Sequence, residues 1–213
     1  MMEKKKNISM AVIKRLPKYH RYLQELMKND VDRISSKELG EKIGFTASQI
    51  RQDLNCFGDF GQQGYGYNVK DLYNQISTIL GIDKNHSYVI VGAGNIGQAV
   101  ANYSRFSELG LNLKGIFDAN PKMSGIKIRD IEIKDIDELA LTLQSEAIDM
   151  GVICVPRVNA QKVCDILIEN GVKGIWNFAP VDLNVPEGVI VENVHLSESM
   201  LTLIYQLNKE EQK

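Results

Sequence analysis

Hydrophobic positions in about the first eighty residues recur at the spacing of helices. Leu16, Leu23 and Met27 fall on one face of a helix whose first turn holds Pro17. Residues 69–80 repeat the pattern and are followed by a glycine, the usual residue after a helix end. The pattern therefore predicts a helical unit at the start of the chain.

Two shorter helices are expected between these. Ser35 with Glu38, and Thr46 with Gln49, have the spacing of capping boxes, and Gly44 ends the first of the two helices. Two short helices joined by a tight turn with glycine are typical of a helix-turn-helix, whose second helix enters the major groove of DNA. The polar positions of that second helix are occupied by Ser48, Gln49, Arg51 and Gln52.

Glycines and aromatic residues alternate from residue 59 to residue 69. This composition predicts two short strands joined by a tight hairpin. A hairpin directly after a recognition helix would be the wing of a winged helix. A glycine-rich surface loop is the alternative for the same residues.

The second half of the chain alternates strands with helices. Strands are expected at 87–91, 113–117, 126–133, 150–155, 174–177 and 189–191, and helices at 96–109, 136–144, 160–170 and 196–207. Strands separated by helices form βαβ units, so we predict a Rossmann-type, doubly wound parallel sheet. The polar stretch 83–86 marks the joint. The expected domains are 1–82 for DNA binding, 83–195 for the Rossmann unit and 196–213 for a C-terminal helix.

Charge is distributed unevenly along the 213 residues. Residues 1–56 hold 12 Lys and Arg against 7 Asp and Glu, whereas residues 57–213 hold 13 against 20. A basic segment on an acidic body is one mark of nucleic-acid binding. The three cysteines include no C-x-x-C pair, which argues against a disulfide framework and a metal site and for the cytoplasm. No apolar run is long enough to span a membrane.

A glycine motif follows the first strand of the second half. Gly92, Gly94 and Gly97 have G-x-G-x-x-G spacing between a strand and a helix, the setting in which the motif binds a dinucleotide. The helix start directs free N–H groups at the pyrophosphate. Asp118 lies 21 positions after Gly97, where a carboxylate accepts hydrogen bonds from the adenosine ribose and repels a 2′-phosphate. The motif predicts NADH and NAD⁺ rather than their phosphorylated forms. The alternative for Asp118 is that it caps the turn that follows.

The second half lacks the residues of a dehydrogenase. The Rossmann core uses nearly all 127 residues from Ser87 to Lys213, which leaves no room for a substrate domain. Tyr205 and Lys209 have the Y-x-x-x-K spacing of short-chain dehydrogenases, but no strand follows to complete that site. We therefore predict that the protein is not an enzyme.

Several motifs together resemble the Rex family of redox-sensing transcriptional repressors. They lie in the first helix, the helix-turn-helix and wing, the glycine loop and the later strand ends, namely residues 14–17, 49–54, 57–61, 64–67, 92–97, 117–118, 154–156, 177–180 and 191–194. The resemblance covers essentially the whole chain. It implies a homodimer that binds operator DNA, an inverted repeat, through winged helices and senses NADH and NAD⁺ through its Rossmann domains. It also implies that the C-terminal helix is exchanged between subunits.

The resemblance completes the sets of candidate residues. For DNA the candidates are Lys14, Arg15, Thr46, Ser48, Gln49, Arg51, Gln52, Gln63 and Tyr65. For the cofactor they are Gly92, Ala93, Gly94, Asn95, Ile96, Gly97, Tyr103, Asp118, Pro156 and Leu196, the last supplied by the partner. Arg21, Tyr103 and His195 match a network that the family uses for switching.

Two positions depart from the family pattern. The wing usually carries an arginine where this sequence has Gln63, and the family commonly has an aspartate where this sequence has His195. The wing contact and the switching network of the family are therefore not carried over unchanged to these positions.

Two functions remain to be compared. One is a repressor that NADH releases from operator DNA. The other is a small NAD-dependent oxidoreductase whose N-terminal helical domain serves for dimerisation. Basic residues on the recognition helix and the missing catalytic groups favour the repressor.

Overall fold

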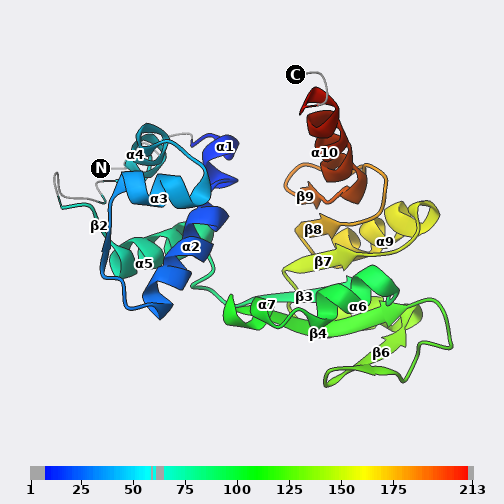
Figure 1. Cartoon of the computed structure of the whole chain (residues 1–213). Coiled ribbons are helices and arrows are strands. Elements are labelled where there is room, and N and C mark those ends of the chain that lie inside the picture. The colour runs from blue at the N-terminus through cyan, green and yellow to red at the C-terminus, as the bar shows by residue number, and fades with distance from the viewer. Residues whose placement is uncertain (1–7, 59, 61–64, 211–213) are drawn as a thin grey trace. The chain divides into compact units, whose positions relative to one another are not determined.

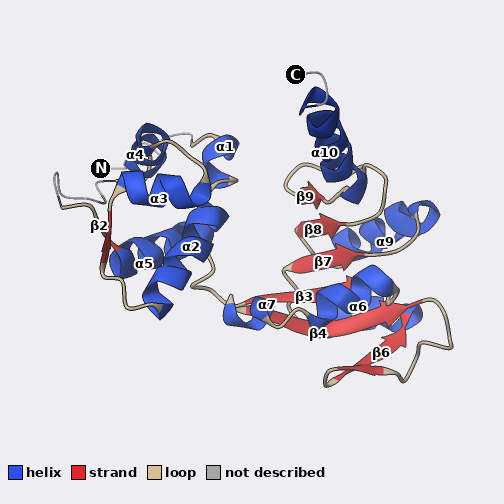
Figure 2. Ribbon diagram, viewed as in Figure 1, coloured by secondary structure: helices blue, strands red, loops and turns tan. Residues whose placement is uncertain are grey.

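The computed structural model describes residues 8–58, 60 and 65–210, which form two compact units, 1–84 and 85–213. Each unit has a hydrophobic core of its own. Figure 1 follows the chain through both, and Figure 2 shows the first to be mainly helical and the second to be built on a sheet.

Helices dominate the first unit. They are α1 (Met10–Ile13), α2 (Leu16–Lys28), α3 (Ser36–Ile43), α4 (Ala47–Asn55) and α5 (Val69–Leu80). Ser35 and Glu38 close a complete capping box on α3, and Thr46 caps α4 through the backbone N–H of Gln49. Gly44 ends α3 in the left-handed conformation, φ 75°. The predicted helix-turn-helix is therefore present as α3 and α4.

A two-stranded antiparallel ribbon accompanies these helices. Strand β1 (Arg33–Ile34) pairs with β2 (Tyr67–Asn68), so the segment before α3 is hydrogen-bonded to the segment before α5. The sequence pattern did not predict β1 or the short helix α1. The predicted wing hairpin lies largely at residues 59 and 61–64, outside the described residues, and Gln63 is among them.

The second unit is a seven-stranded sheet with the order β5-β6-β4-β3-β7-β8-β9. Its strands are β3 (His86–Val91), β4 (Leu111–Asp118), β5 (Lys127–Ile128), β6 (Ile131–Asp135), β7 (Met150–Ile153), β8 (Gly174–Asn177) and β9 (Ile190–Asn193). All neighbours pair in parallel except β5 and β6. The predicted Rossmann-type doubly wound sheet is confirmed. Strand β3 lies in the middle of the sheet, and the strand order runs outward from it in opposite directions, first through β4 and then through β7.

Successive residues of β3 point to opposite faces of the sheet and into different cores. Val89 and Val91 pack with helices α8 (Leu139–Ser145) and α9 (Arg157–Glu169), whereas Tyr88 and Ile90 pack with α6 (Asn95–Asn102) on the other face. The remaining elements are α7 (Arg105–Glu108), a 3₁₀ turn η1 (Ile136–Glu138) and α10 (Leu196–Glu210). Burial on both faces explains the continuous apolar run of β3.

Two sequence predictions in this unit were wrong in detail. The helix expected over 96–109 breaks at Tyr103, where the backbone is extended, and becomes α6 and α7. The single strand expected over 126–133 is the hairpin β5–β6, with Arg129 at φ 57° in its turn. Neither position carries a glycine or proline, so the local sequence gave no signal for the break or the turn.

Candidate nucleotide site and helix-turn-helix surface

The three glycines after β3 meet different steric demands. A Cβ on Gly92 would lie 2.5 Å from the carbonyl oxygen of Cys154, and φ there is 100°. A Cβ on Gly97 would collide with the Gly92 carbonyl oxygen. A Cβ on Gly94, in contrast, would meet nothing within 4 Å. Gly92 and Gly97 are therefore required by the fold, whereas the space in front of Gly94 is open to a ligand.

Asp118, at the end of β4, holds the loop and faces the cavity. Its Oδ2 accepts a hydrogen bond from the Ala93 N–H at 2.6 Å, and its Oδ1 accepts one from the Asn120 N–H at 2.7 Å. Asp118 thus caps its own turn, the alternative considered from the sequence. Because a carboxylate has about four acceptor positions, it keeps acceptor capacity for ribose hydroxyls.

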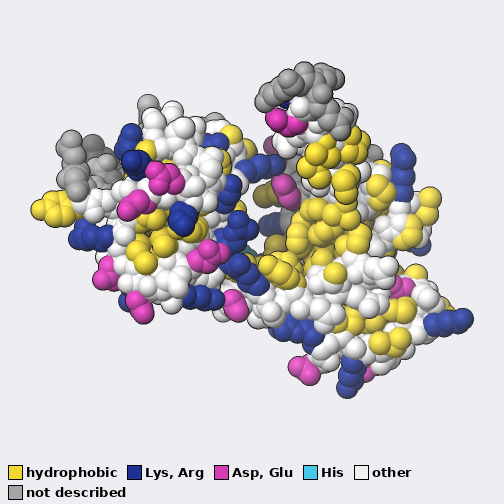
Figure 3. Space-filling model, in the orientation of Figure 1, with side chains coloured by type: hydrophobic (Ala, Val, Ile, Leu, Met, Phe, Trp, Pro, Cys, Tyr) yellow, Lys and Arg dark blue, Asp and Glu magenta, His cyan; other side chains and the backbone are white. Residues whose placement is uncertain are grey.

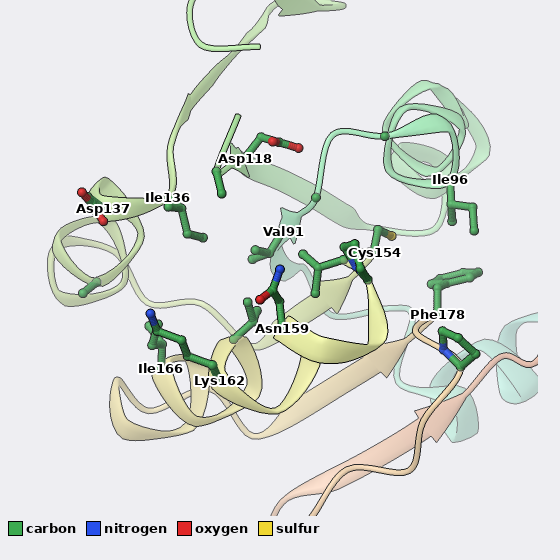
Figure 4. A pocket seen from close by; sticks show the side chains of 18 residues that line it. Val91, Ile96, Asp118, Ile136, Asp137, Cys154, Asn159, Lys162, Ile166 and Phe178 are labelled. Atoms are coloured by element: carbon green, nitrogen blue, oxygen red, sulfur yellow. The ribbon is translucent and has the colours of Figure 1, made fainter. Parts of the chain in front are cut away.

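A cavity of about 720 Å³ opens in front of this loop, within the usual size range of ligand pockets. Figure 4 shows its lining side chains, which come from the carboxyl ends of β3, β4, β7 and β8, from the first turns of α6 and α8, and from η1 and α9. This is the edge of a doubly wound sheet where nucleotides bind. The cavity's lining is largely apolar, with Asp118, Asp137 and Lys162 as its charged side chains among the described residues.

The cavity gathers only some of the predicted cofactor residues. Those that line it are Gly92, Gly94, Ile96, Asp118 and Pro156. Ala93, Asn95 and Gly97 belong to the same loop and helix start but do not line it. Tyr103 is half exposed and packs on Phe106, with ring centroids 4.7 Å apart, and Leu196 opens α10 on the surface. Neither contributes to the cavity within one chain.

Sequence reasoning missed part of the lining. Asp137, Asn159 and Lys162 reach the cavity from η1 and the first turns of α9. Their signal is positional: each follows a strand whose carboxyl end meets the same edge of the sheet. Cys154 also lines the cavity, and burial raises the pKa of its thiol to about 12, which keeps it protonated at neutral pH.

On α4 the exposed side chains form one stripe. Ser48, Arg51 and Gln52 are exposed, while Ile50 and Leu54 are buried in the core of the first unit. Arg51 donates a hydrogen bond from Nη1 to Ser36 Oγ at 2.9 Å. Figure 3 shows basic side chains on this unit. The arrangement suits a recognition helix that presents polar side chains to a groove.

The other DNA candidates fall into three environments. Arg15 and Gln49 both donate to Asp53, a buried residue that the sequence analysis did not single out. Thr46 is the helix cap described above. Lys14 and Tyr65 are exposed, and Arg33 of β1 donates to the Tyr65 carbonyl oxygen at 3.4 Å. Arg33 is a basic residue beside the wing segment that sequence reasoning also missed.

The three predicted switch residues lie in different units. Arg21 is exposed on α2, whereas Tyr103 and His195 belong to the second unit. His195 lies just before α10, with Nε2 4.0 Å from Asp182 Oδ1. A carboxylate therefore lies near His195 although the family's acid at that position is absent. The network with Arg21 stays a prediction.

Over residues 8–58, 60 and 65–210, no group of His, Cys, Asp and Glu is arranged to hold a metal ion. Within the same residues, no helix is both long and apolar enough to cross a bilayer.

Comparisons with known proteins match each half of the chain to a family and the whole chain to single relatives. A family described as "CoA binding domain" matches residues 83–181, and one described as "Putative DNA-binding protein N-terminus" matches residues 7–55. The "Redox-sensing transcriptional repressor Rex" of Clostridium botulinum (strain Alaska E43 / Type E3) is 75% identical over 209 residues, 98% of this chain and all of the relative. The chain belongs to the Rex family of redox-sensing transcriptional repressors. The Rex of Clostridium perfringens (strain SM101 / Type A) is 72% identical over 212 residues, 100% of both chains.

Solved Rex structures agree with the fold. The crystal structure of RSP in complex with beta-NAD⁺ and operator DNA is 60% identical with a TM-score of 0.91, covering 97% of this chain and 95% of that one. The complex of RSP with beta-NADH is 57% identical with a TM-score of 0.89, covering 97% of each chain. These findings confirm the family predicted from the sequence. Because the Rex relatives are named as repressors, they favour the repressor over the oxidoreductase.

Proposed function

We propose that this Rex chain is a homodimeric repressor that binds inverted-repeat operator DNA and is released when NADH binds. The observation that carries the proposal is the presence, in one chain, of a nucleotide-sized cavity on a Rossmann sheet and an exposed recognition helix. A 60%-identical relative was crystallised with both NAD⁺ and operator DNA, which supports the same pair of ligands here. A repressor of this kind acts on DNA in the cytoplasm.

The cavity suits a dinucleotide by its shape and its polar groups. The open space at Gly94 lets a pyrophosphate approach the start of α6, where backbone N–H groups are free of a side-chain cap. Asp118 offers its remaining acceptor capacity to the adenosine ribose, which favours NADH and NAD⁺ over their 2′-phosphates. Oxidised nicotinamide is cationic and reduced nicotinamide is neutral. An apolar pocket would therefore favour NADH.

The homodimer is supported by the surface of α10. Its apolar side chains are all exposed within one chain, an unusual state for a helix of 15 residues. They are Leu196, Met200, Leu201, Leu203, Ile204, Tyr205 and Leu207. Figure 3 shows hydrophobic side chains gathered over this part of the second unit. Exchange of α10 between two copies would bury this surface and bring Leu196 to the partner's cofactor site.

The switch follows from thermodynamic linkage. NADH weakens operator binding only if it binds one arrangement of the DNA-binding units more tightly than another. A tenfold loss of operator affinity requires about 1.4 kcal/mol of coupling. Arg21, Tyr103 and His195 are the residues that we propose to report this change from one unit to the other.

The test is operator binding measured by fluorescence anisotropy, with the duplex crystallised with RSP as the probe. We expect binding without nucleotide, release by NADH, and less effect from NAD⁺ at equal concentration. NADH absorbance is followed in parallel. Operator affinity that does not respond to NADH, or steady NADH consumption on adding small carbonyl substrates, would contradict the proposal.

A further inference from the structure

Asp53 is a fully buried carboxylate on the inward side of the recognition helix α4. Its Oδ2 accepts hydrogen bonds from Arg15 Nε and Tyr19 Oη, both at 2.6 Å. Its Oδ1 accepts from Arg15 Nη2 at 2.7 Å and from Gln49 Nε2 at 2.8 Å. The donors come from the α1–α2 junction, from α2 and from the first turn of α4. One carboxylate therefore joins the recognition helix to the helices that precede it.

The buried charge is compensated by its partners. Burial alone would raise the pKa of Asp53, but the hydrogen bonds from Arg15, Tyr19 and Gln49 outweigh it and hold the pKa below its ordinary value. The same contact raises the pKa of Arg15. The pair is ionised at neutral pH, and its short side-on geometry is that of a strong charge-assisted contact. These bonds fix the conformation of every side chain that donates to Asp53.

This contact changes what two DNA candidates can do. Gln49 directs its amide donor inward and is partly buried, unlike Ser48, Arg51 and Gln52, which are exposed on the outer stripe of α4. Arg15 gives two N–H groups on one edge to Asp53. Its side chain is 23% exposed, and a guanidinium carries five N–H donors, so its other edge still has donors for a ligand.

We propose that Asp53 is a positioning residue for operator binding, which turns Gln49 away from the bases and fixes Arg15 as a clamp on a DNA phosphate beside α4. The proposal rests on the proposed function, since it needs the helix-turn-helix to bind DNA. It reassigns two of the DNA candidates: Gln49 becomes structural, and Arg15 supplies affinity without sequence preference.

Physical reasoning supports a phosphate as the ligand of Arg15. Arg15 is the N-cap of α2 and is bonded to Asp53 of α4, so its guanidinium lies beside the recognition helix. Phosphate contacts at such a position fix register without reading sequence. A guanidinium edge matches two phosphate oxygens. Because Asp53 already orders the side chain, DNA binding does not have to restrict it further.

The direction in which Asp53→Asn changes DNA affinity separates a positioning role of Asp53 from a simple effect of its charge. Asp53→Asn removes a negative charge from a DNA-binding unit, which by electrostatics alone would tighten DNA binding. Positioning predicts the reverse, because Arg15 loses its side-on partner. A merely structural role is separated by the double variant: if Asp53 acts through Arg15, Asp53→Asn adds no further loss in the Arg15→Ala background.

The experiment uses the full chain and two labelled duplexes, the RSP operator and a scrambled duplex of equal composition, over a range of salt concentrations. The variants are Arg15→Ala, Gln49→Ala, Asp53→Asn and the Arg15→Ala/Asp53→Asn double variant. Ser77→Ala is the matched control, since Ser77 makes a part-buried hydrogen bond with His20 in the same unit but on α5. Circular dichroism verifies that each variant is folded.

We expect Arg15→Ala, Asp53→Asn and the double variant to lower the affinity for both duplexes by a similar factor. Arg15→Ala should flatten the slope of log K against log salt by about 0.9, the loss of one phosphate contact. Gln49→Ala should keep the ratio of operator to scrambled affinity, and Ser77→Ala should keep both affinities.

Three results would overturn the positioning role: unchanged or tighter binding by Asp53→Asn, an unchanged salt slope in Arg15→Ala, or a tenfold drop of the affinity ratio in Gln49→Ala. If Asp53→Asn does not fold, Arg15→Lys replaces it. That variant keeps the charge but loses the fork, and unchanged affinity there would equally reject the idea. Failure of the proposed function is distinct, because the unmodified protein would then bind both duplexes alike.

Discussion

Individual residues of the nucleotide loop differ in what the fold requires of them. A side chain at Gly97 would collide with the Gly92 carbonyl oxygen, whereas a Cβ at Gly94 would meet no atom of the chain within 4 Å. The fold therefore requires Gly97, whereas at Gly94 we propose that the requirement comes from nucleotide binding.

We therefore expect Gly94→Ala to fold normally but to bind NADH poorly, because the new methyl group occupies the pyrophosphate approach. Gly97→Ala should instead lower the melting temperature, since helix α6 must move away from β3. Calorimetric titration with NADH and thermal unfolding measure the two effects. Equal NADH affinity of Gly94→Ala and the unmodified protein would contradict the assigned approach.

Asp118 has a structural role, and we propose that it also binds the adenosine ribose. The informative quantity is therefore the ratio of the affinities for NADH and NADPH. Asp118→Ala should lower the affinity for NADH roughly tenfold or more, because a hydrogen bond to a charged group is lost. It should also reduce the preference for NADH over NADPH, because the repulsion of the 2′-phosphate is gone. Titration of both nucleotides tests this. The assigned role is wrong if the unmodified protein binds both equally.

The depressed pKa of Asp53 has a consequence for acid stability. Its stabilising contribution is complete above the ordinary carboxyl pKa of 3.8 and is lost as pH falls through the lower pKa of the folded state. We expect the first unit of the native protein to lose stability between about pH 5 and pH 2 more steeply than in Asp53→Asn. Trp176, the single tryptophan, reports the second unit. Comparing its fluorescence with circular dichroism isolates the first unit, and parallel pH profiles would contradict the expectation.

At the scale of elements, the orientation of α4 decides which of its side chains face outward, where DNA could reach them. Its buried face carries Ile50, Asp53 and Leu54, which leaves Ser48, Arg51 and Gln52 outward. The hydrogen bond from Arg51 to Ser36 is exposed and can be exchanged for one to a base.

Arg51→Ala should cost roughly 1–3 kcal/mol of operator affinity if Arg51 grips a guanine edge. The loss should be larger on the operator than on a scrambled duplex, unlike that of Arg15→Ala. Lys28→Ala, which removes an exposed cation at the end of α2, is the control and should change little. Fluorescence anisotropy at moderate salt measures both affinities. Unchanged operator affinity in Arg51→Ala would show that Arg51 does not contact a base.

For the whole molecule, the exposed apolar face of α10 is the surface that we propose to be buried in the dimer. Met200 and Ile204 are four residues apart and share one helical face. Replacing both with lysine should convert the proposed dimer to a monomer, because charged residues cannot be buried there unpaired. Operator affinity should then fall strongly, since two half-sites are no longer bound together.

Light scattering at several concentrations measures the mass, and Gln206→Lys on the polar side of α10 is the control. A double variant that remains dimeric at the concentration of the unmodified protein would show that α10 is not the interface.

The sequence alone determined the features that depend on neighbouring residues. The capping box at Ser35, the N-cap at Thr46, the left-handed glycine at 44 and the strand–glycine–helix order at 92–97 all act within a few positions. The second capping box expected at Thr46 is incomplete, because the side chain of Gln49 donates to Asp53 instead. Alternating strands and helices fixed the fold class, and the motifs identified the family. Each of these signals is local, or is a pattern repeated along the chain.

Only the tertiary structure decided which distant residues meet. Asp53 is buried because Arg15, 38 positions away, compensates its charge, and nothing near Asp53 in the sequence announces that pairing. The same holds for the pairing of β1 with β2 and for Lys162 at the cavity. The residue type alone does not tell whether a polar side chain is exposed or buried. Its role is set by long-range packing, because a buried charge or donor is tolerated only where the fold supplies a partner.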